Sequence, residues 1–300
     1  MILKEYAVDP TCIGDWHLFR YLIESFGVPR GRLIAKYPSK WLQMVYASCG
    51  SFTFQQKQKL EIELTRIKKY GLSKTSRTYD GNFDWLENAL AQHEIKPFYA
   101  IISEKDDINH QVLAVSEITE VDPLWGIQRT MVVPRNAESM AAAVSTLLVS
   151  SQHIVLIDPH FGPENIRHRR PLQAFLRAAV ENRSARMPEI EIHTQVKSSK
   201  EFFREQCQNR LTPLIPADLK VRFVRWTVKP DGQPLHNRYI LTDLGGVSFQ
   251  HGLDDDRNRE GATDDIALLD RDSYEQRWAE YVGENPAFDL CEEPFELVGR

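Results

Sequence analysis

Cysteine is scarce in this sequence, and its placement excludes several kinds of site. The 300 residues include four cysteines, and no two of them form a Cys-x-x-Cys pair; they are Cys12, Cys49, Cys207 and Cys291. Zinc sites and disulfide frameworks both depend on cysteines at characteristic spacings. The sequence therefore predicts isolated thiols in a reducing compartment, with the cytoplasm as the expected location, and it predicts no zinc site.

Long apolar segments are also missing. No stretch of about 18 apolar residues occurs, which is the length that a membrane-spanning helix needs. Residues 1–5, Met-Ile-Leu-Lys-Glu, do not lead into the apolar core of a signal peptide. The sequence therefore predicts no transmembrane helix, no secretion signal and no membrane partner.

An excess of basic charge is absent as well. Lys and Arg together number 37 against 42 Asp and Glu, which gives a formal net charge of −5. This balance does not by itself indicate a nucleic-acid-binding protein, although a local basic groove can coexist with an acidic whole. The composition, 42% hydrophobic and 26% charged, is that of a globular chain with a sizeable core.

The most informative stretch that is present runs from residue 235 to residue 249. His236 and Arg238 are two positions apart, so in a strand their side chains would lie on one face. Residues 239–241 are apolar and continue that strand, and residues 243–246 predict a turn into a return strand. An imidazole beside a guanidinium suits a phosphate, because one group can attack phosphorus while the other holds a non-bridging oxygen.

The spacing of His236, Arg238 and Asp243 resembles the phospholipase D superfamily motif. That motif reads His-x-Lys, four residues, Asp, six residues, Gly-Ser-x-Asn. Arg238 stands where the family has Lys, and the hairpin is about two residues longer. Gly252-Leu253-Asp254-Asp255 replaces the Gly-Ser-x-Asn end. The resemblance covers roughly residues 140–300.

The resemblance implies an α/β fold, a phospholipase D-like sandwich with a mixed sheet flanked by helices, over residues 135–300. Predicted strands at 153–157, 190–196 and 221–228 alternate with helices at 171–182 and 200–214; the His236 hairpin, a strand at 266–269 and a helix at 273–282 follow. Residues 1–134 predict a smaller α+β domain of unknown role. In it, strands at 98–102 and 111–115 are joined by a polar hairpin at 103–110.

The family mechanism, as the resemblance implies it, needs two such histidines in one site and no metal or other cofactor. One imidazole forms a phosphohistidine, and the other protonates the leaving oxygen. No second copy of the motif occurs, because His168 lacks the downstream Asp and His193 lacks the base. The single-motif nucleases of this family act as homodimers. The resemblance therefore implies a homodimer in which two copies of His236 meet.

The other charged residues receive roles from their positions in the motif. Arg238 would bind phosphate oxygens, and Asp243 would support the hairpin. Asp264, or alternatively Asp265, would orient His236, and Asp255 occupies the place of the motif Asn. A basic segment could follow a nucleic-acid backbone or could equally be a solvated helix surface; its residues include Arg167, Arg169 and Arg170.

The preferred hypothesis is a metal-independent phosphodiesterase that acts as a nuclease on DNA or RNA. Family analogy suggests a context in prokaryotic defence, with additional protein subunits as candidate partners. One alternative is a catalytically silent phospholipase D-like subunit that binds nucleic acid or serves assembly. Another is a phospholipid hydrolase or transferase. For His236 itself, the alternative is a hairpin-edge residue paired with Asp243.

Overall fold

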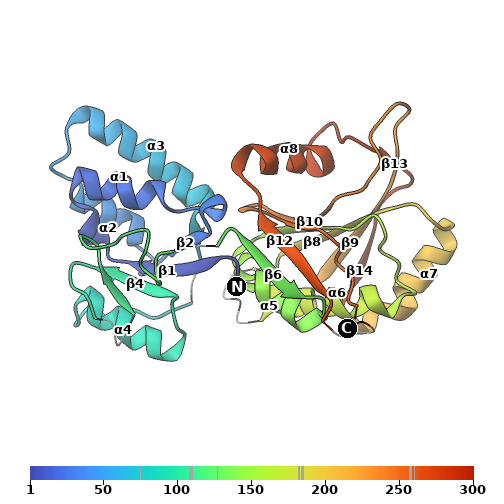
Figure 1. The fold of residues 1–300 in the computed structure, drawn as a ribbon, viewed down its shortest axis with the longest axis horizontal. Coiled ribbons are helices and arrows are strands. Elements are labelled where there is room, and N and C mark those ends of the chain that lie inside the picture. The colour runs from blue at the N-terminus through green and yellow to red at the C-terminus, as the bar shows by residue number, and fades with distance from the viewer. Residues whose placement is uncertain are drawn as a thin grey trace. The chain divides into compact units, whose positions relative to one another are not determined.

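A computed structural model describes residues 1–74, 76–107, 111–126, 128–181, 183, 186–256, 259 and 261–300. The chain divides into two compact units (Figure 1). One unit is Leu3–Gln128, and the other combines Met1–Ile2 with Arg129–Arg300. Each unit contains one sheet with helices packed against it, so the protein is mixed α/β.

The N-terminal unit is built on a five-stranded sheet in which all strand pairs are parallel. Its strands, in the spatial order β3-β2-β1-β4-β5, are β3 (Leu72–Ser73), β2 (Arg32–Ala35), β1 (Lys4–Val8), β4 (Ala100–Ser103) and β5 (Val112–Ala114). Strands β2 and β4 are buried at every residue, as parallel strands covered on both faces usually are. The expected α+β class for this part is therefore corrected to parallel α/β.

The predicted hairpin between residues 98 and 115 is wrong. Strands β4 and β5 pair in parallel, with Ile101 opposite Val112 and Ser103 opposite Ala114. Part of the proposed turn, residues 108–110, lies outside the described residues. The sequence signal for a polar turn was local, whereas the direction of pairing depends on how the whole sheet is ordered. The unbroken apolar run Ala100-Ile101-Ile102 was the better signal, since it is typical of a parallel strand.

Helices cover both faces of this sheet, and most of them begin at side-chain caps. They are α1 (Trp16–Glu24), α2 (Trp41–Ser48), α3 (Phe54–Tyr70) and α4 (Trp85–Ile95), with 3-10 turns at Pro10–Ile13 and Val28–Arg30. Thr53 and Gln56 form a capping box at the start of α3, and Asp15 accepts from two backbone N–H groups of α1. One core cluster joins α1, α2 and α3 to the sheet, and α4 packs on the other face.

The C-terminal unit is built on a nine-stranded mixed sheet in the order β13-β9-β8-β7-β10-β11-β12-β6, with β14 also pairing with β9. Only β7, β8 and β9 are mutually parallel. The strands are β6 (Thr130–Pro134), β7 (His153–Ile157), β8 (Glu189–Gln195), β9 (Lys220–Thr227), β10 (Arg238–Thr242), β11 (Gly245–Phe249), β12 (Thr263–Leu268), β13 (Asp289–Leu290) and β14 (Phe295–Val298). The prediction of a mixed sheet flanked by helices is confirmed.

Helices lie on both faces of this second sheet (Figure 1). They are α5 (Ala137–Ser150), α6 (Ile166–Val180), α7 (Lys200–Arg210) and α8 (Arg271–Val282), with a 3-10 turn at Thr212–Leu214. Helix α8 packs Tyr274 and Tyr281 against Val155 and Trp226. On the other face, Phe175 of α6 meets Phe249 edge to face. The helix predicted at 171–182 begins earlier, at Ile166, with Pro171 inside it, and residue 182 lies outside the described residues.

The unit boundary lies before β6 and not at Pro134. Strand β6 pairs with β12 from Thr130 to Pro134, so these residues, which the sequence assigned to the N-terminal domain, belong to the C-terminal sheet. A short edge strand carries little local signal, because only its neighbour in space completes it. In the described parts of the chain, no helix has both the length and the apolar character needed to cross a membrane.

Candidate active site

Charged side chains and histidines gather at one edge of the C-terminal sheet, the edge formed by strand ends. Strands β7 and β8 are parallel and end there, whereas β10 is antiparallel to β7 and begins there. Strand β11 ends at the same edge, and β12 begins at it. The residues that these ends carry are Asp158, His160, Lys197, His236, Arg238, His251 and Asp264.

His236 is exposed and lies in the loop before β10, so the expectation that it shares a strand with Arg238 is corrected. The ladder between β10 and β7 stops at the pair Tyr239–Ile157. Two residues later the β7 chain reaches Pro159, which has no N–H to extend the ladder. His236 is therefore a loop residue at the mouth of the sheet.

Arg238 is the first residue of β10 and lies opposite Phe249 of β11. Its side chain is half-buried, and its Nε is buried with no hydrogen-bond partner among the described residues. A buried donor without a partner costs free energy, so a site of this kind favours an incoming acceptor. The structure therefore brings Arg238 to the predicted edge with a hydrogen-bond donor that no described residue uses.

Asp243 is not brought to His236. Its Oδ1 accepts hydrogen bonds from the backbone N–H of Gln152, at 2.8 Å, and of His153, at 3.2 Å. Asp243 follows the far end of β10, and the five residues of that strand span about 16 Å. The carboxylate thus fastens the β10–β11 turn to the start of β7. This placement excludes the alternative in which His236 is paired with Asp243.

Asp264 lies at the predicted edge, on β12, and is 1% exposed. Its Oδ1 accepts from the backbone N–H of Gln250 and of His251, both at 3.0 Å. Its Oδ2 is buried and has no hydrogen-bond partner among the residues that the structure describes. Asp265, the alternative candidate, is exposed. Of the two, only Asp264 presents a buried carboxylate oxygen at this edge.

The basic segment is partly engaged by the acidic loop that replaces the Gly-Ser-x-Asn end. Arg167 contacts Asp254 at 2.7 Å, and Arg135 contacts the same carboxylate at 2.6 Å. Arg170 lies 3.8 Å from Asp255, which is 1% exposed, and the N–H of Asp255 donates to the carbonyl of Arg167. Of the predicted substrate-binding residues, Arg167 and Arg170 therefore both contact Asp255. Their predicted role toward substrate stays a prediction.

Arg169 differs from its neighbours on α6. It is half-buried, and its Nε is buried without a hydrogen-bond partner among the described residues. The arginines of this segment are therefore not equivalent, although the sequence presents them as one basic run. Successive residues on a helix point in different directions, so only some of them face the acidic loop.

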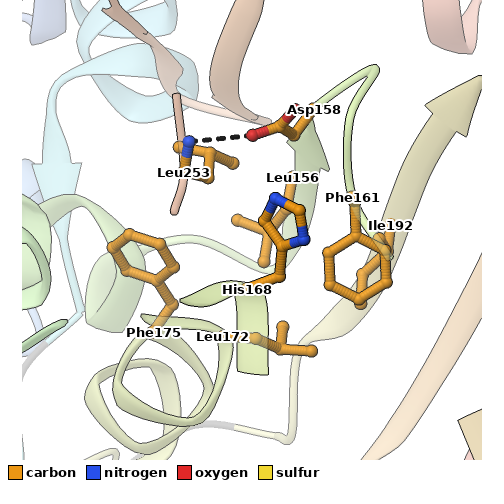
Figure 2. Close-up of a pocket in the computed structure, with 8 residues that line it drawn as sticks. All are labelled: Leu156, Asp158, Phe161, His168, Leu172, Phe175, Ile192 and Leu253. Atoms are coloured by element: carbon orange, nitrogen blue, oxygen red, sulfur yellow. Dashed lines mark hydrogen bonds between the residues drawn. The ribbon is translucent and has the colours of Figure 1, made fainter. Parts of the chain in front are cut away.

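Asp158 ties two loops together beneath the edge. Its Oδ1 accepts from the N–H of His160 at 2.8 Å, and its Oδ2 accepts from the N–H of Leu253 at 2.9 Å (Figure 2). Gly252, with φ +142°, precedes Leu253, and an added Cβ would lie 3.3 Å from Asp158 Oδ2. Glycine is needed at this position because other residues rarely adopt such a φ. The carboxylate thus sets the path of the loop after β11.

A small cavity of about 20 Å³ lies below Asp158, with room for one water molecule. In Figure 2 the His168 ring points from α6 toward Asp158. The Nδ1 of His168 accepts from the N–H of Gly162 at 3.0 Å. The remaining lining is apolar and consists of Leu156, Phe161, Leu172, Phe175, Ile192 and Leu253. This cavity is a packing feature under the edge, and its size excludes an organic substrate.

Sequence reasoning missed two residues at the edge, His160 and Lys197. The Nδ1 of His160 and the Nζ of Lys197 are in hydrogen-bond contact. The pKa of His160 is lowered by burial and then by the charges of Lys197 and Arg238. His160 and Lys197 are 37 positions apart, so no local motif could reveal them. The only available signal was that each follows a predicted strand closely.

A second group of histidines lies away from this edge, on the face of the sheet that α8 covers. Glu191 accepts from His153 at 2.8 Å and from His193 at 3.1 Å. The indole of Trp226 donates to the other ring nitrogen of His193, at 3.1 Å. Burial alone would raise the pKa of Glu191, but hydrogen bonds from the two histidines outweigh it and lower that pKa. These side chains form a largely buried hydrogen-bond network inside the unit.

No protein-family model matches the chain, and no curated protein matches its sequence. Across the residues that the structure describes, no group of three or more His, Cys, Asp or Glu side chains is arranged to hold a metal ion.

Proposed function

We propose that this chain is a phospholipase D-like phosphodiesterase that cleaves nucleic acid without a metal ion, through a phosphohistidine on His236. The observation that carries the proposal is the position of His236 and Arg238 at one sheet edge, with Arg238 making no ion pair among the described residues. An exposed imidazole next to an uncompensated guanidinium is suited to a phosphate ester.

The order of the elements supports the same family. The parallel strands β7, β8 and β9 alternate with α6 and α7, and the antiparallel hairpin β10–β11 then follows. The His236 motif stands at the start of that hairpin, where the resemblance places it. Asp264 follows on β12 with one buried carboxylate oxygen free of hydrogen bonds among the described residues, which suits the orienting role.

In the proposed reaction, a ring nitrogen of His236 attacks phosphorus in line and forms an N–P bond while the ester P–O bond opposite breaks. A second imidazole donates a proton to the leaving oxygen. Water then attacks phosphorus, the N–P bond breaks to release the phosphate product and free His236, and the same second imidazole takes a proton from that water. Arg238 stays bound to the non-bridging oxygens and balances the charge that develops on them.

The second imidazole is proposed to be His236 of another copy of the chain. The motif occurs once in the sequence, and a two-fold axis would bring two identical loops together. The loop position of His236, ahead of β10 and exposed, is compatible with such a shared site. DNA and RNA are the proposed substrates because their repeating phosphodiesters suit the cations Arg238 and Lys197 at this edge.

A specific observation favours a second candidate, a catalytically silent subunit that binds nucleic acid. The loop that replaces Gly-Ser-x-Asn leads into Asp254, Asp255 and Asp256. The carboxylates of Asp254 and Asp256 contact Arg135 and Arg167, and that of Asp255 lies 3.8 Å from Arg170. Acidic side chains in place of amide and hydroxyl donors reduce the number of groups that can donate to a phosphate. Binding by Arg238 would persist in such a subunit.

The test is a cleavage assay in excess EDTA with single-stranded DNA, double-stranded DNA, RNA, a generic diester and phospholipid vesicles. The variants are His236→Ala and, as a matched control, His17→Ala, an exposed histidine of the N-terminal unit. We expect wild type and His17→Ala to cleave nucleic acid equally, and His236→Ala to lose about 10³-fold or more in rate. Nucleic-acid binding without cleavage by wild type would favour the silent subunit. Headgroup release from vesicles would replace nucleic acid by phospholipid as the substrate.

A further inference from the structure

Two neighbouring loops at the candidate edge bring a histidine and a lysine together. His160 lies in the loop after β7, and Lys197 lies in the loop after β8. Because these strands are parallel neighbours, their carboxyl ends meet at the same edge. The Nδ1 of His160 faces the Nζ of Lys197, and both side chains are exposed. The pair is therefore open to solvent and to a ligand.

Arg238 is the third member of this group. It belongs to β10, which pairs with β7 on the side away from β8, and its charge acts on His160. Neither Arg238 nor Lys197 forms an ion pair with any carboxylate that the structure describes, whereas Arg135 and Arg167 do. Two fixed positive charges thus flank one imidazole without neutralisation by an acid.

One carboxylate lies close by, but its hydrogen-bonding capacity is already used. Asp158 is 4% exposed and accepts from the backbone N–H groups of His160 and Leu253. It favours the charged form of His160, but burial and the two cations act more strongly in the other direction. The group as a whole therefore keeps an excess of positive charge at the surface.

The protonation pattern of His160 follows from its partner. A lysine ammonium can only donate, so the Nδ1 of His160 must accept. In a neutral imidazole the proton then resides on Nε2, which becomes a donor. Lys197, Arg238 and His160 therefore all present donors, and none of the three presents a free acceptor. A ligand that fits must carry several acceptor oxygens and a negative charge.

We infer that His160, Lys197 and Arg238 form a phosphate clamp that holds the non-bridging oxygens of the substrate diester. This clamp deepens the proposed function and depends on it for the identity of the ligand as a diester. Lys197 and Arg238 bind the oxygens as cations, and the Nε2–H of His160 donates a third hydrogen bond. His160 does not serve as the second acid, because its Nδ1 is committed to an ammonium group.

The groups of the clamp come from the ends of different strands of one chain. Arg238 occupies the motif position, and Lys197 provides a second positive charge from the opposite side of β7. Phosphate between two cations on different strands is fixed in orientation as well as in position, which favours in-line attack by His236. The clamp also supplies donors that the acidic loop 254–256 cannot supply.

Inorganic phosphate is the probe for this inference, because its binding does not require turnover. Calorimetric titration would compare wild type with Lys197→Ala, His160→Ala and the control Lys200→Ala, an exposed lysine on the nearby start of α7. We expect Lys197→Ala to weaken phosphate binding by at least about tenfold and His160→Ala by several-fold. Lys200→Ala should remain within about twofold of wild type.

The outcomes separate this inference from the proposed function. If wild type does not bind phosphate, or if Lys197→Ala and His160→Ala bind it as tightly as wild type, the clamp is overturned, even where wild type cleaves diesters. If wild type binds phosphate through Lys197 but cleaves no diester, the clamp stands and the phosphodiesterase proposal fails. Cleavage that falls in Lys197→Ala together with phosphate binding supports both.

Discussion

The two sheets of this protein differ in the charged residues at the ends of neighbouring central strands. In the N-terminal unit, Asp9 follows β1 and Glu104 follows the neighbouring β4. Burial raises the pKa of Asp9, and Glu104 and Asp84 add repulsion. In the C-terminal unit, Lys197 follows β8, and Arg238 begins β10. Lys36 and Lys74 follow the outer strands β2 and β3, so the acidic character of the first edge is confined to the ends of β1 and β4.

This difference shows that topology alone does not assign function. The carboxyl ends of parallel strands are a common place for ligand sites in α/β proteins, so both edges qualify by position. The residues in the loops decide which ligands each edge can accept. Asp9 and Glu104, at the ends of β1 and β4, would repel a phosphodiester, whereas the cations and donors at the second edge attract it.

Exchanging the charge of the second edge tests the contrast directly. Arg238→Asp would give that edge the acidic character of the first, and we expect diester cleavage to fall by about 10³-fold or more. The matching change in the other unit, Asp9→Asn, should leave cleavage at the wild-type rate. Initial rates in excess EDTA measure both. Wild-type rates in Arg238→Asp would remove Arg238 from the site.

A buried ion pair supports the loop that carries Lys197, and its loss should be costly for stability. Arg225 contacts Glu292 at 3.1 Å, with both side chains at most 9% exposed, and it also donates to the carbonyl of Ser198. Glu292→Gln would leave the guanidinium without its counter-charge, and we expect a loss of about 3 kcal/mol in the free energy of unfolding.

The matched control for this prediction is Glu296→Gln. Glu296 pairs with Lys220 at 3.3 Å, and both side chains are largely exposed. An exposed pair is screened by solvent, so this change should alter the free energy of unfolding by less than about 0.5 kcal/mol. Urea unfolding of the three proteins measures the difference. Equal losses in the two variants would mean that burial does not strengthen the Arg225 pair.

The buried histidine network predicts a dependence of stability on pH. Burial lowers the pKa of His193 below its ordinary value of 6.5, against the opposing effect of Glu191. Below that pH the unfolded chain binds a proton that the folded chain refuses, so stability falls as pH drops below about 6.5. The slope from this group is at most about 1.4 kcal/mol per pH unit.

Glu191 affects stability in a lower pH range, so its effect can be separated from that of His193. Its pKa is lowered from 4.5, so its contribution is fully present above that value and is lost only as pH falls below it. Urea unfolding between about pH 5.5 and pH 7.5 should therefore show the His193 effect, and His193→Gln should flatten it. An unchanged slope in His193→Gln would assign the dependence to other groups; His17→Gln is the control.

Part of this architecture could be read from local patterns alone. Helix α3 begins at a capping box and ends before Gly71, and the side chain of Asn136 caps the start of α5, so local residues mark the limits of both helices. The apolar run 153–157 predicted β7, and the alternation around residue 238 predicted the β10–β11 hairpin. These signals act within a few residues, so they are present in the sequence whether or not the chain is folded.

Pairing between distant segments could not be read in the same way. The sequence alone indicated many of the helices and strands, and it singled out His236 and Arg238. Only the tertiary structure decided that β4 and β5 are parallel and that Arg135 contacts Asp254, which is 119 positions away. It also decided that Lys197 meets His160. Contacts of this kind depend on the packing of the whole sheet, because no spacing along the chain encodes which strand ends become neighbours.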